Sequence, residues 1–301
     1  MSQPMELDHE RAHQLRALAA RIEEHDGIAA FGAAALTDLD RPEPRDEYAV
    51  IVQDGEPVAF AWCDGASAEL GVHPDHRRAG LGSRLLTEVY DRHPSVGVWA
   101  HGTLPAARRL AEREGLSIDR ELWFMEVDLT PIEELITQDP GQVETELTPP
   151  EGMVIRAFTP EDEDALLEVN AAAFAHHPEQ GQLDAPAFAE LRAQDWFEPH
   201  LLRVVVDEAA GRERLAGFVW LKPVRPGVIE LFVLGVHPDY QGRRLGTLLI
   251  REGLVTAINM GATRAELYVD GADDVATHSY ERQGFQHTGT DTHYVRETPL
   301  A

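Results

Sequence analysis

Two stretches of the sequence place glycine and arginine at the start of a helix-forming segment, an arrangement suited to binding a phosphate. Residues 70–86 read LGVHPDHRRAGLGSRLL, and residues 234–249 read LGVHPDYQGRRLGTLL. In each, a proline ends a strand-like apolar run, and the helix that follows begins with backbone N–H groups that have no acceptor within the helix. Such N–H groups bind anions, and glycine lets a ligand approach the backbone closely. The sequence therefore predicts two sites for a phosphorylated ligand.

The segments around these two sites are also repeated. VAFAW at residues 58–62 recurs as AGFVW at residues 216–220, and a short helical segment that ends in EREGL recurs as one that ends in ERQGF. Landmarks that recur in the same order indicate two copies of one domain. The segment between the copies is acidic and contains proline and glycine, which is typical of a linker. We predict an N-terminal domain at 1–130, a linker at 131–152 and a C-terminal domain at 153–301.

Helical and strand-like patterns alternate within each copy. In the second copy we expect a helix after Thr159-Pro160 and a last strand at the end of the chain. The other expected strands are 153–158, 201–206, 214–220, 228–236 and 265–269, and the other expected helices are 184–193, 242–260 and 273–283. The order predicts an α/β fold of the α+β type, in which helices flank a mixed, largely antiparallel central sheet.

The phosphate-binding stretches match neither a P-loop nor a dinucleotide-binding motif, because GKS/T and GxGxxG are both missing. They resemble the pyrophosphate-binding signature of the GCN5-related N-acetyltransferases (GNATs), written Q/R-x-x-G-x-G/A. Residues 77–82, RRAGLG, match it fully, whereas residues 241–246, QGRRLG, have Arg244 where glycine is usual. The resemblance implies two tandem GNAT domains.

Acetyl transfer to an amine needs a base that takes a proton from the amine and an acid that meets the departing thiolate. GNATs often supply the acid as a tyrosine on the helix after the fifth strand, and Tyr280 in THSYERQGF matches that place. The first copy has Ala111 there. Glu230 lies six residues before Val236 on the strand that enters the site, and the equivalent residue of the first copy is Ala66. We therefore assign catalysis to the second copy and expect the first to bind acetyl-CoA without catalysing transfer.

Further segments resemble the mycothiol synthase family over nearly the whole chain. They are WAHGTLPAAR at 99–108, VNAAAFAHHPEQG at 169–181, DWFEP at 195–199 and DTHY at 291–294. Members of that family use acetyl-CoA to acetylate the cysteinyl amine of a cysteinyl-glucosaminyl-inositol, the last step in making mycothiol. The resemblance implies Glu230 as base and Tyr280 as acid. It places Glu179, Lys222, Glu230 and Tyr268 around the substrate.

The resemblance also implies contacts with acetyl-CoA in both copies. In the first copy these are Leu70, Gly71, Val72, Arg78, Ala79, Gly80, Leu81, Gly82 and Ser83. In the second they are Leu234, Gly235, Val236, Gln241, Gly242, Arg243, Arg244, Leu245, Gly246, Thr247, Asp273, Asp274, Val275, Ala276, Thr277 and His278.

The composition of the chain limits the classes of molecule that it is expected to bind. A formal net charge of −27 argues against nucleic acid, since such binding neutralises phosphates with Lys and Arg. The sequence has no apolar run long enough to span a membrane and no signal-peptide core, so we expect a cytoplasmic protein that acts on a small molecule. We expect it to be a monomer.

Cys63, the one cysteine, lies in an apolar strand-like run and is interpreted as a packed residue. His176, His177 and Glu179 lack a second cluster of ligands, so we expect no metal.

Two other functions stay open. The first is an N-acetyltransferase for an aminoglycoside, a polyamine or a protein N-terminus. The second is a non-catalytic acetyl-CoA-binding protein, which Arg244 favours and the pair Glu230 and Tyr280 argues against.

Overall fold

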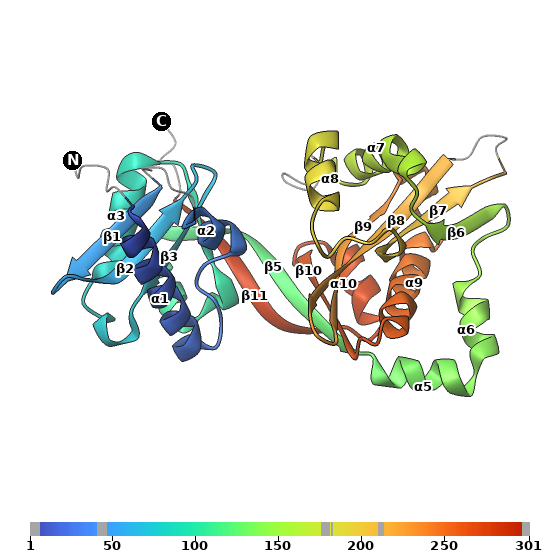
Figure 1. The fold of residues 1–301 in the computed structure, drawn as a ribbon, viewed down its shortest axis with the longest axis horizontal. Coiled ribbons are helices and arrows are strands. Elements are labelled where there is room, and N and C mark those ends of the chain that lie inside the picture. The colour runs from blue at the N-terminus through green and yellow to red at the C-terminus, as the bar shows by residue number, and fades with distance from the viewer. Residues whose placement is uncertain (1–6, 41–46, 176–180, 182, 210–213, 297–301) are drawn as a thin grey trace. The chain divides into compact units, whose positions relative to one another are not determined.

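The computed structural model describes residues 7–40, 47–175, 181, 183–209 and 214–296, and its chain divides into two compact units (Figure 1). The first unit contains the chain up to Trp123, together with Asp270–Ala272 and the chain from Gly289. The second contains Phe124–Val269 and Asp273–Thr288. No helix among the described residues is long and apolar enough to cross a membrane.

Helices cover both faces of the sheet of the first unit. Its strands run in the order β1-β2-β3-β4-β11 and are β1 (Tyr48–Gln53), β2 (Glu56–Cys63), β3 (Ser67–Val72), β4 (Gly97–Ala100) and the later part of β11 (Gln286–Arg296). Its helices are α1 (His9–Asp26), α2 (Ala33–Asp38), α3 (Leu81–Arg92) and α4 (Pro105–Glu114). Because side chains alternate along β2, Phe60 and Trp62 pack with α1 and α2, whereas Ala59 and Ala61 pack with α3. Cys63 is buried in this core, as predicted.

The second unit repeats this plan. Its strands run in the order β10-β9-β8-β7-β6 and are β6 (Met153–Ala157), β7 (Leu202–Asp207), β8 (Arg214–Arg225), β9 (Val228–Val236) and β10 (Arg264–Asp270). Its helices are α5 (Thr130–Gln138), α6 (Pro140–Leu147), α7 (Glu163–Ala173), α8 (Ala185–Arg192), α9 (Leu245–Asn259) and α10 (Asp274–Glu281). Phe218 and Trp220 of β8 pack in one core cluster with residues of α7 and α8. Gly253 of α9 lies against Val219 on the other face.

Most strand pairs of both units are antiparallel, and β3–β4 and β9–β10 are parallel, so the predicted fold class is confirmed. The unit limits differ from the sequence-based domain limits. Residues 131–152 contain α5 and α6, and Glu146 forms an ion pair of 3.2 Å with Arg251 of α9. β5 (Leu116–Asp128) leaves the first unit at Trp123, and the end of β11 pairs with β4, with Thr292 opposite Ala100.

In each unit the two central parallel strands separate soon after they pair. β9 and β10 pair from Val228 opposite Arg264 to Glu230 opposite Glu266, although β9 continues to Val236 and β10 to Asp270. β3 and β4 behave alike, since their pairing ends at Ala68, four residues before β3 ends. The backbone groups on that side of β9 and β3 beyond the paired residues are left for another partner. Ligands of open α/β sheets bind in crevices of this kind, at the carboxyl ends of strands.

The HPD sequences close the turn at the end of each opened strand. His73 and His237 each accept a hydrogen bond of 3.2 Å, from the backbone N–H of Asp75 and Asp239 respectively. The proline between them starts a short 3₁₀ turn, Pro74–His76 or Pro238–Tyr240. The repeated histidines therefore cap a turn.

The first residue of each pyrophosphate-binding signature forms a hydrogen bond with the last residue of the strand before the turn. The side chain of Arg77 donates to the carbonyl of Val72 at 3.1 Å, and the side chain of Gln241 donates to the carbonyl of Val236 at 3.4 Å. Arg77 also donates two hydrogen bonds of 2.8 Å to Asp26, and these lower the pKa of that carboxyl group. Arg and Gln are therefore interchangeable here as donors to a carbonyl.

The two loops that follow share one backbone conformation with the residue types exchanged. Arg78 and Gly80 have φ of 66° and 78°, and Gly242 and Arg244 have φ of 75° and 63°. Left-handed backbone is easy for glycine and strained for arginine. Arg244 therefore occupies the place of Gly80 without changing the loop.

Replacing Arg244 by glycine is expected to stabilise the second unit by about 1 kcal/mol, because the exposed arginine adopts a left-handed conformation that costs about that much. Gly80→Ala is expected to destabilise the first unit by a similar amount. Thermal denaturation of the full chain measures both. A loss of stability in Arg244→Gly would mean that side-chain contacts of Arg244 outweigh its backbone strain.

Candidate functional site

Three charged residues lie side by side on three neighbouring strands of the second unit. Lys222 of β8 is the register partner of Glu230 of β9, which is in turn the partner of Glu266 of β10. The Nζ of Lys222 lies 3.9 Å from Oε2 of Glu230. Partners in register point to the same face of a sheet, so the three side chains form one row at the point where β9 and β10 separate.

A bulge in the ladder sets this register. Trp220 pairs with Val233 but Leu221 pairs with Leu231, so Phe232 is an extra residue on β9. The corresponding ladder of the first unit continues without a shift, with Trp62 opposite Glu69. β8 also extends past Trp220, the predicted end of this strand, to Arg225. Pro223 is accommodated because it lies next to a second register shift. Both irregularities place Lys222 opposite Glu230.

Burial and neighbouring charges act on Glu230 in opposite directions. Its side chain is 14% exposed, and burial is the main reason that its pKa is raised. Lys222 opposes this shift and Glu266 adds to it. Glu266 is itself buried and is bound by both terminal nitrogens of Arg225, at 2.7 and 3.2 Å. A carboxyl group with a raised pKa is suited to accept a proton near neutral pH.

Aromatic rings surround the head of Lys222. Its Nζ lies 5.0 Å from the ring centre of Phe232 and 5.7 Å from that of Trp196. Tyr268 lies two residues after Glu266 on β10, so it faces the same side of the sheet, and the residue is 52% exposed beside Phe124. The predicted substrate residues Lys222, Glu230 and Tyr268 therefore share one face, and Glu179 lies outside the described residues.

Tyr280 belongs to a different element, α10. Its ring packs edge-on against Phe285, with ring centres 5.7 Å apart. Burial, with a smaller contribution from Asp273, raises the pKa of its hydroxyl group to about 12. The phenol therefore keeps its proton at neutral pH and is able to donate it.

The predicted acetyl-CoA residues lie at the open strands and at the helix starts that follow. Residues 70–72 and 234–236 are the last residues of β3 and β9. The first backbone hydrogen bonds of α3 and α9 join Arg84 to Gly80 and Leu248 to Arg244, so the three N–H groups before each bond precede the helical ladder. These groups belong to Leu81, Gly82, Ser83, Leu245, Gly246 and Thr247.

Arginines flank these helix starts in different ways. Arg78, Arg243 and Arg244 are all exposed, and the guanidinium of Arg243 also lies 5.0 Å from the ring of Tyr240. Exposed guanidinium groups next to free N–H groups favour an anion. Both loops therefore offer the elements of a phosphate site.

Residues 273–278 form the start of α10. The carboxylate of Asp273 caps this helix by accepting a hydrogen bond of 2.9 Å from the N–H of Ala276. Thr277 donates its hydroxyl to the carbonyl of Asp273, and Nδ1 of His278 lies 2.7 Å from the carbonyl of Asp274. Because the cap already satisfies an N–H group with a carboxylate, this helix start is a weaker anion site than those of α3 and α9.

Sequence reasoning missed Glu266 and Arg225. The segment RAELYVDG placed Glu266 on the same strand face as Tyr268, since they are two residues apart, and this alternation was the available signal. Nothing in the sequence indicated that Arg225 reaches Glu266, because the bulges decide the register.

Comparison with known proteins agrees with the internal repeat. The Acetyltransferase (GNAT) family matches residues 165–285, and an Acetyltransferase (GNAT) domain matches residues 44–115. A GCN5-related N-acetyltransferase from Sphaerobacter thermophilus superimposes with a TM-score of 0.70 at 23% identity, over 96% of this chain and 93% of its own. A tandem GNAT protein from the clavulanic acid biosynthesis pathway does so with a TM-score of 0.69 at 20% identity, over 99% and 98%. These structures share the fold.

Closer relatives define the family. The chain is 37% identical to the mycothiol acetyltransferase of Actinosynnema mirum, over 96% of this chain and 97% of that one. It is 41% identical to that of Rhodococcus jostii, over 77% and 74%. It is 34% identical to that of Kytococcus sedentarius, over 97% and 96%. The chain is therefore an acyltransferase that belongs to the mycothiol acetyltransferase family of tandem GNAT proteins.

Proposed function

We propose that this protein transfers the acetyl group of acetyl-CoA to the cysteinyl amine of a cysteinyl-glucosaminyl-inositol, the reaction that completes mycothiol. The observation that carries the proposal is the row Lys222, Glu230 and Glu266 in the second unit, in a chain whose relatives are named mycothiol acetyltransferases. The row combines a partly buried carboxyl group of raised pKa with a lysine that can donate hydrogen bonds to the polar groups of an acceptor.

Glu230 acts as the base in this proposal. The amine of the acceptor is protonated at neutral pH and must lose a proton before it attacks the thioester. Glu230 takes that proton, directly or through a water molecule. The neutral amine then adds to the carbonyl carbon of the thioester. Burial supports this role, because it brings the pKa of Glu230 closer to that of the amine.

Tyr280 acts as the acid. When the tetrahedral intermediate collapses, the carbon–sulfur bond breaks and the thiolate of CoA accepts a proton from the tyrosine hydroxyl. The tyrosinate regains a proton from the positively charged nitrogen of the intermediate, directly or through a water molecule, so that one hydrogen remains on the amide nitrogen. The products are an amide and CoA thiol, and the proton on Glu230 returns to solvent. The raised pKa of Tyr280 supports this role, since the hydroxyl is fully protonated between turnovers.

The face around the row suits the rest of the acceptor. Lys222 can donate to carbonyl or hydroxyl oxygens, and the exposed ring of Tyr268 offers an apolar surface to a sugar ring. Residues of 273–278, together with the loops and strand ends of both units, are proposed to contact acetyl-CoA. The first unit is proposed to bind acetyl-CoA without transferring its acetyl group, because Ala66 and Ala111 replace the base and the acid.

Mass spectrometry of small-molecule products tests the proposed function. The purified full chain is incubated with acetyl-CoA and cysteinyl-glucosaminyl-inositol, and in parallel with a polyamine and with an aminoglycoside. We expect one acetyl group on the cysteinyl amine alone. Acetylation of only a control amine would show that the acceptor is a different amine from the one proposed. Binding of acetyl-CoA without any product would favour a sensing role.

Glu230→Gln is expected to lower kcat by about 10²–10⁴-fold, with little effect on acetyl-CoA affinity, because it removes the base and keeps the shape of the side chain. Steady-state kinetics and calorimetric titration measure the two effects. Glu252→Gln is the matched control, because Glu252 is also partly buried and paired, with Arg203 at 2.8 Å. Near-normal turnover in Glu230→Gln would exclude this residue as the base.

Tyr280→Phe is expected to slow acetyl transfer from acetyl-CoA by at least about tenfold. It should slow transfer from phenyl thioacetate much less, because thiophenolate is a leaving group that departs without a proton. Tyr90→Phe, in the core of the first unit, serves as the control. If the variant lost the same factor with both donors, Tyr280 would have a packing role against Phe285 and no role in proton transfer.

The pKa of Glu230 is expected to respond in opposite directions to its two charged neighbours. Glu266→Gln removes a negative charge and should lower the pKa, whereas Lys222→Met removes a positive charge and should raise it. Carbon-13 NMR of labelled glutamate across a pH titration gives the pKa, and the resonance is assigned by its absence in Glu230→Gln. Shifts of the same sign in both variants would contradict this electrostatic account.

A further inference from the structure

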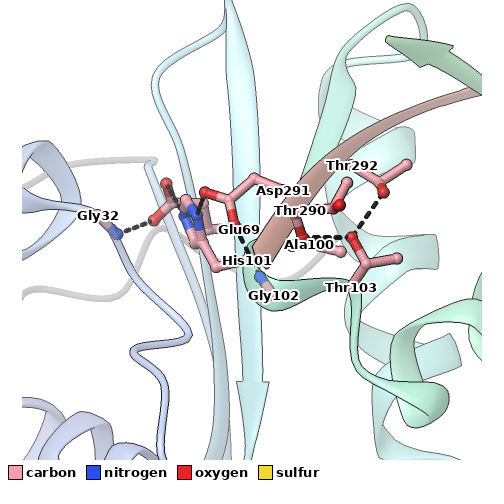
Figure 2. A network of polar contacts seen from close by, with 9 residues as sticks. All are labelled: Gly32, Glu69, Ala100, His101, Gly102, Thr103, Thr290, Asp291 and Thr292. Carbon is pink, nitrogen blue, oxygen red and sulfur yellow. Dashed lines mark hydrogen bonds and ion pairs between the residues drawn. The ribbon is translucent and has the colours of Figure 1, made fainter. Parts of the chain in front are cut away.

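A histidine of the first unit is held between two carboxylates that lie far apart in the sequence (Figure 2). Nε2 of His101 lies 3.1 Å from Oε1 of Glu69 on β3, and Nδ1 lies 2.7 Å from Oδ2 of Asp291 on β11. The backbone N–H groups of Gly32 and Gly102 donate to the same two carboxylates, at 2.8 and 2.7 Å. His101 belongs to the WAHG segment and Asp291 to the DTHY segment, two landmarks that the proposed chemistry of the second unit leaves unexplained.

This arrangement makes His101 a cation. Each ring nitrogen faces a carboxylate, so both nitrogens donate when the ring is protonated. Although burial disfavours the charge, the hydrogen bonds that the ring donates to Asp291 and Glu69 raise the pKa of His101 to about 10. The stabilisation is therefore complete below the ordinary histidine pKa of about 6.5 and is lost as the pH rises through about 10. An imidazolium held in this way cannot act as a base at neutral pH.

The position of this cation corresponds to the acceptor side of the second unit. Glu69 follows Ala68, the last residue of β3 that pairs with β4, so it lies where these two strands separate. His101 follows the last residue of β4. In the second unit the matching separation begins after Glu230 and Glu266, the carboxylates of the charged row. Both units therefore place two carboxylates beside the opening between their parallel strands.

We propose that His101 fills a cation site of the first unit, between Glu69 and Asp291, that would otherwise bind the ammonium group of a small amine. With the site filled from within, the first unit is closed to an acceptor even where its loop and its open strand hold a CoA thioester. This inference concerns the first unit alone and does not depend on the acceptor proposed for the second.

The hydrogen-bonding requirements of the site define its ligand. A ligand must carry a positive charge and at least two N–H donors that point to carboxylates on opposite sides, as imidazolium and primary ammonium ions do. The His101 side chain is 21% exposed, so removing it leaves a site that small ions in solution can reach. Tetramethylammonium carries the charge without any donor and serves as the matched ion.

The test uses the full chain with His101→Gly, in which the carboxylates keep their places and the imidazole is missing. Thermal denaturation is followed at pH 6 with up to 100 mM imidazolium, methylammonium, tetramethylammonium or sodium chloride. Imidazolium and methylammonium are expected to raise the Tm of the variant by roughly 3 °C or more in a saturable way. The wild-type chain should respond to all four salts alike.

His293→Ala is the control for loss of a paired histidine in the same unit, because Nδ1 of His293 faces a single carboxylate, that of Asp119, at 2.8 Å. It should show no specific response to the two donor cations. Equal responses of both variants, or no difference between methylammonium and tetramethylammonium in His101→Gly, would overturn the proposal.

Two further variants keep the test decisive if His101→Gly does not fold. His101→Lys supplies another cation with N–H donors, and His101→Met has a side chain of similar size without charge. The proposal predicts that the lysine variant retains a Tm well above that of the methionine variant. Equal stability, or a more stable methionine variant, would show that the position requires bulk and not a cation.

Discussion

The early separation of two parallel strands is the constraint on which the sites of this protein depend. β9 and β10 share three residue pairs before they part, and β3 and β4 part after Ala68. Each separation leaves strand backbone available next to a helix start whose N–H groups are also unused by the helix. A ligand with a phosphate at one end and an acyl group at the other can satisfy both sets of groups at once. The same opening is therefore suited to binding a donor and to delimiting the space for an acceptor.

The two units place different charges beside this opening, and the difference follows from strand register. The extra residue Phe232 puts Lys222 opposite Glu230 in the second unit, where the carboxyl group forms an ion pair of 3.9 Å with this lysine and has a raised pKa. In the first unit Glu69 is bound by an imidazolium and a backbone N–H. The two units therefore differ in how the carboxyl group beside the opening is paired.

Local patterns in the sequence were sufficient to predict the fold and part of the candidate site. Periodicity located most of the described strands and helices of the second unit to within a few residues, but β8 runs on through Pro223, and α5 and α6 lie where the sequence predicted a linker. The repeat located the two loops that are expected to bind phosphate. Arg244, which departs from the glycine of the signature, has the backbone conformation of Gly80. The partners of Glu230 and His101 were not predictable, because they depend on bulges and on pairings such as Thr292 with Ala100 between residues far apart in sequence.

The pairing of β11 with β4 has a consequence for the order of events during synthesis. The first unit has most of its residues by Trp123, yet β4 lacks its outer partner and His101 lacks Asp291 until the chain from Gly289 has been made. At about 5–20 residues per second, this delay is on the order of 10–30 s. The half of the chain that leaves the ribosome first is thus completed last, and its exposed strand edge must be kept from pairing with other chains in the interval.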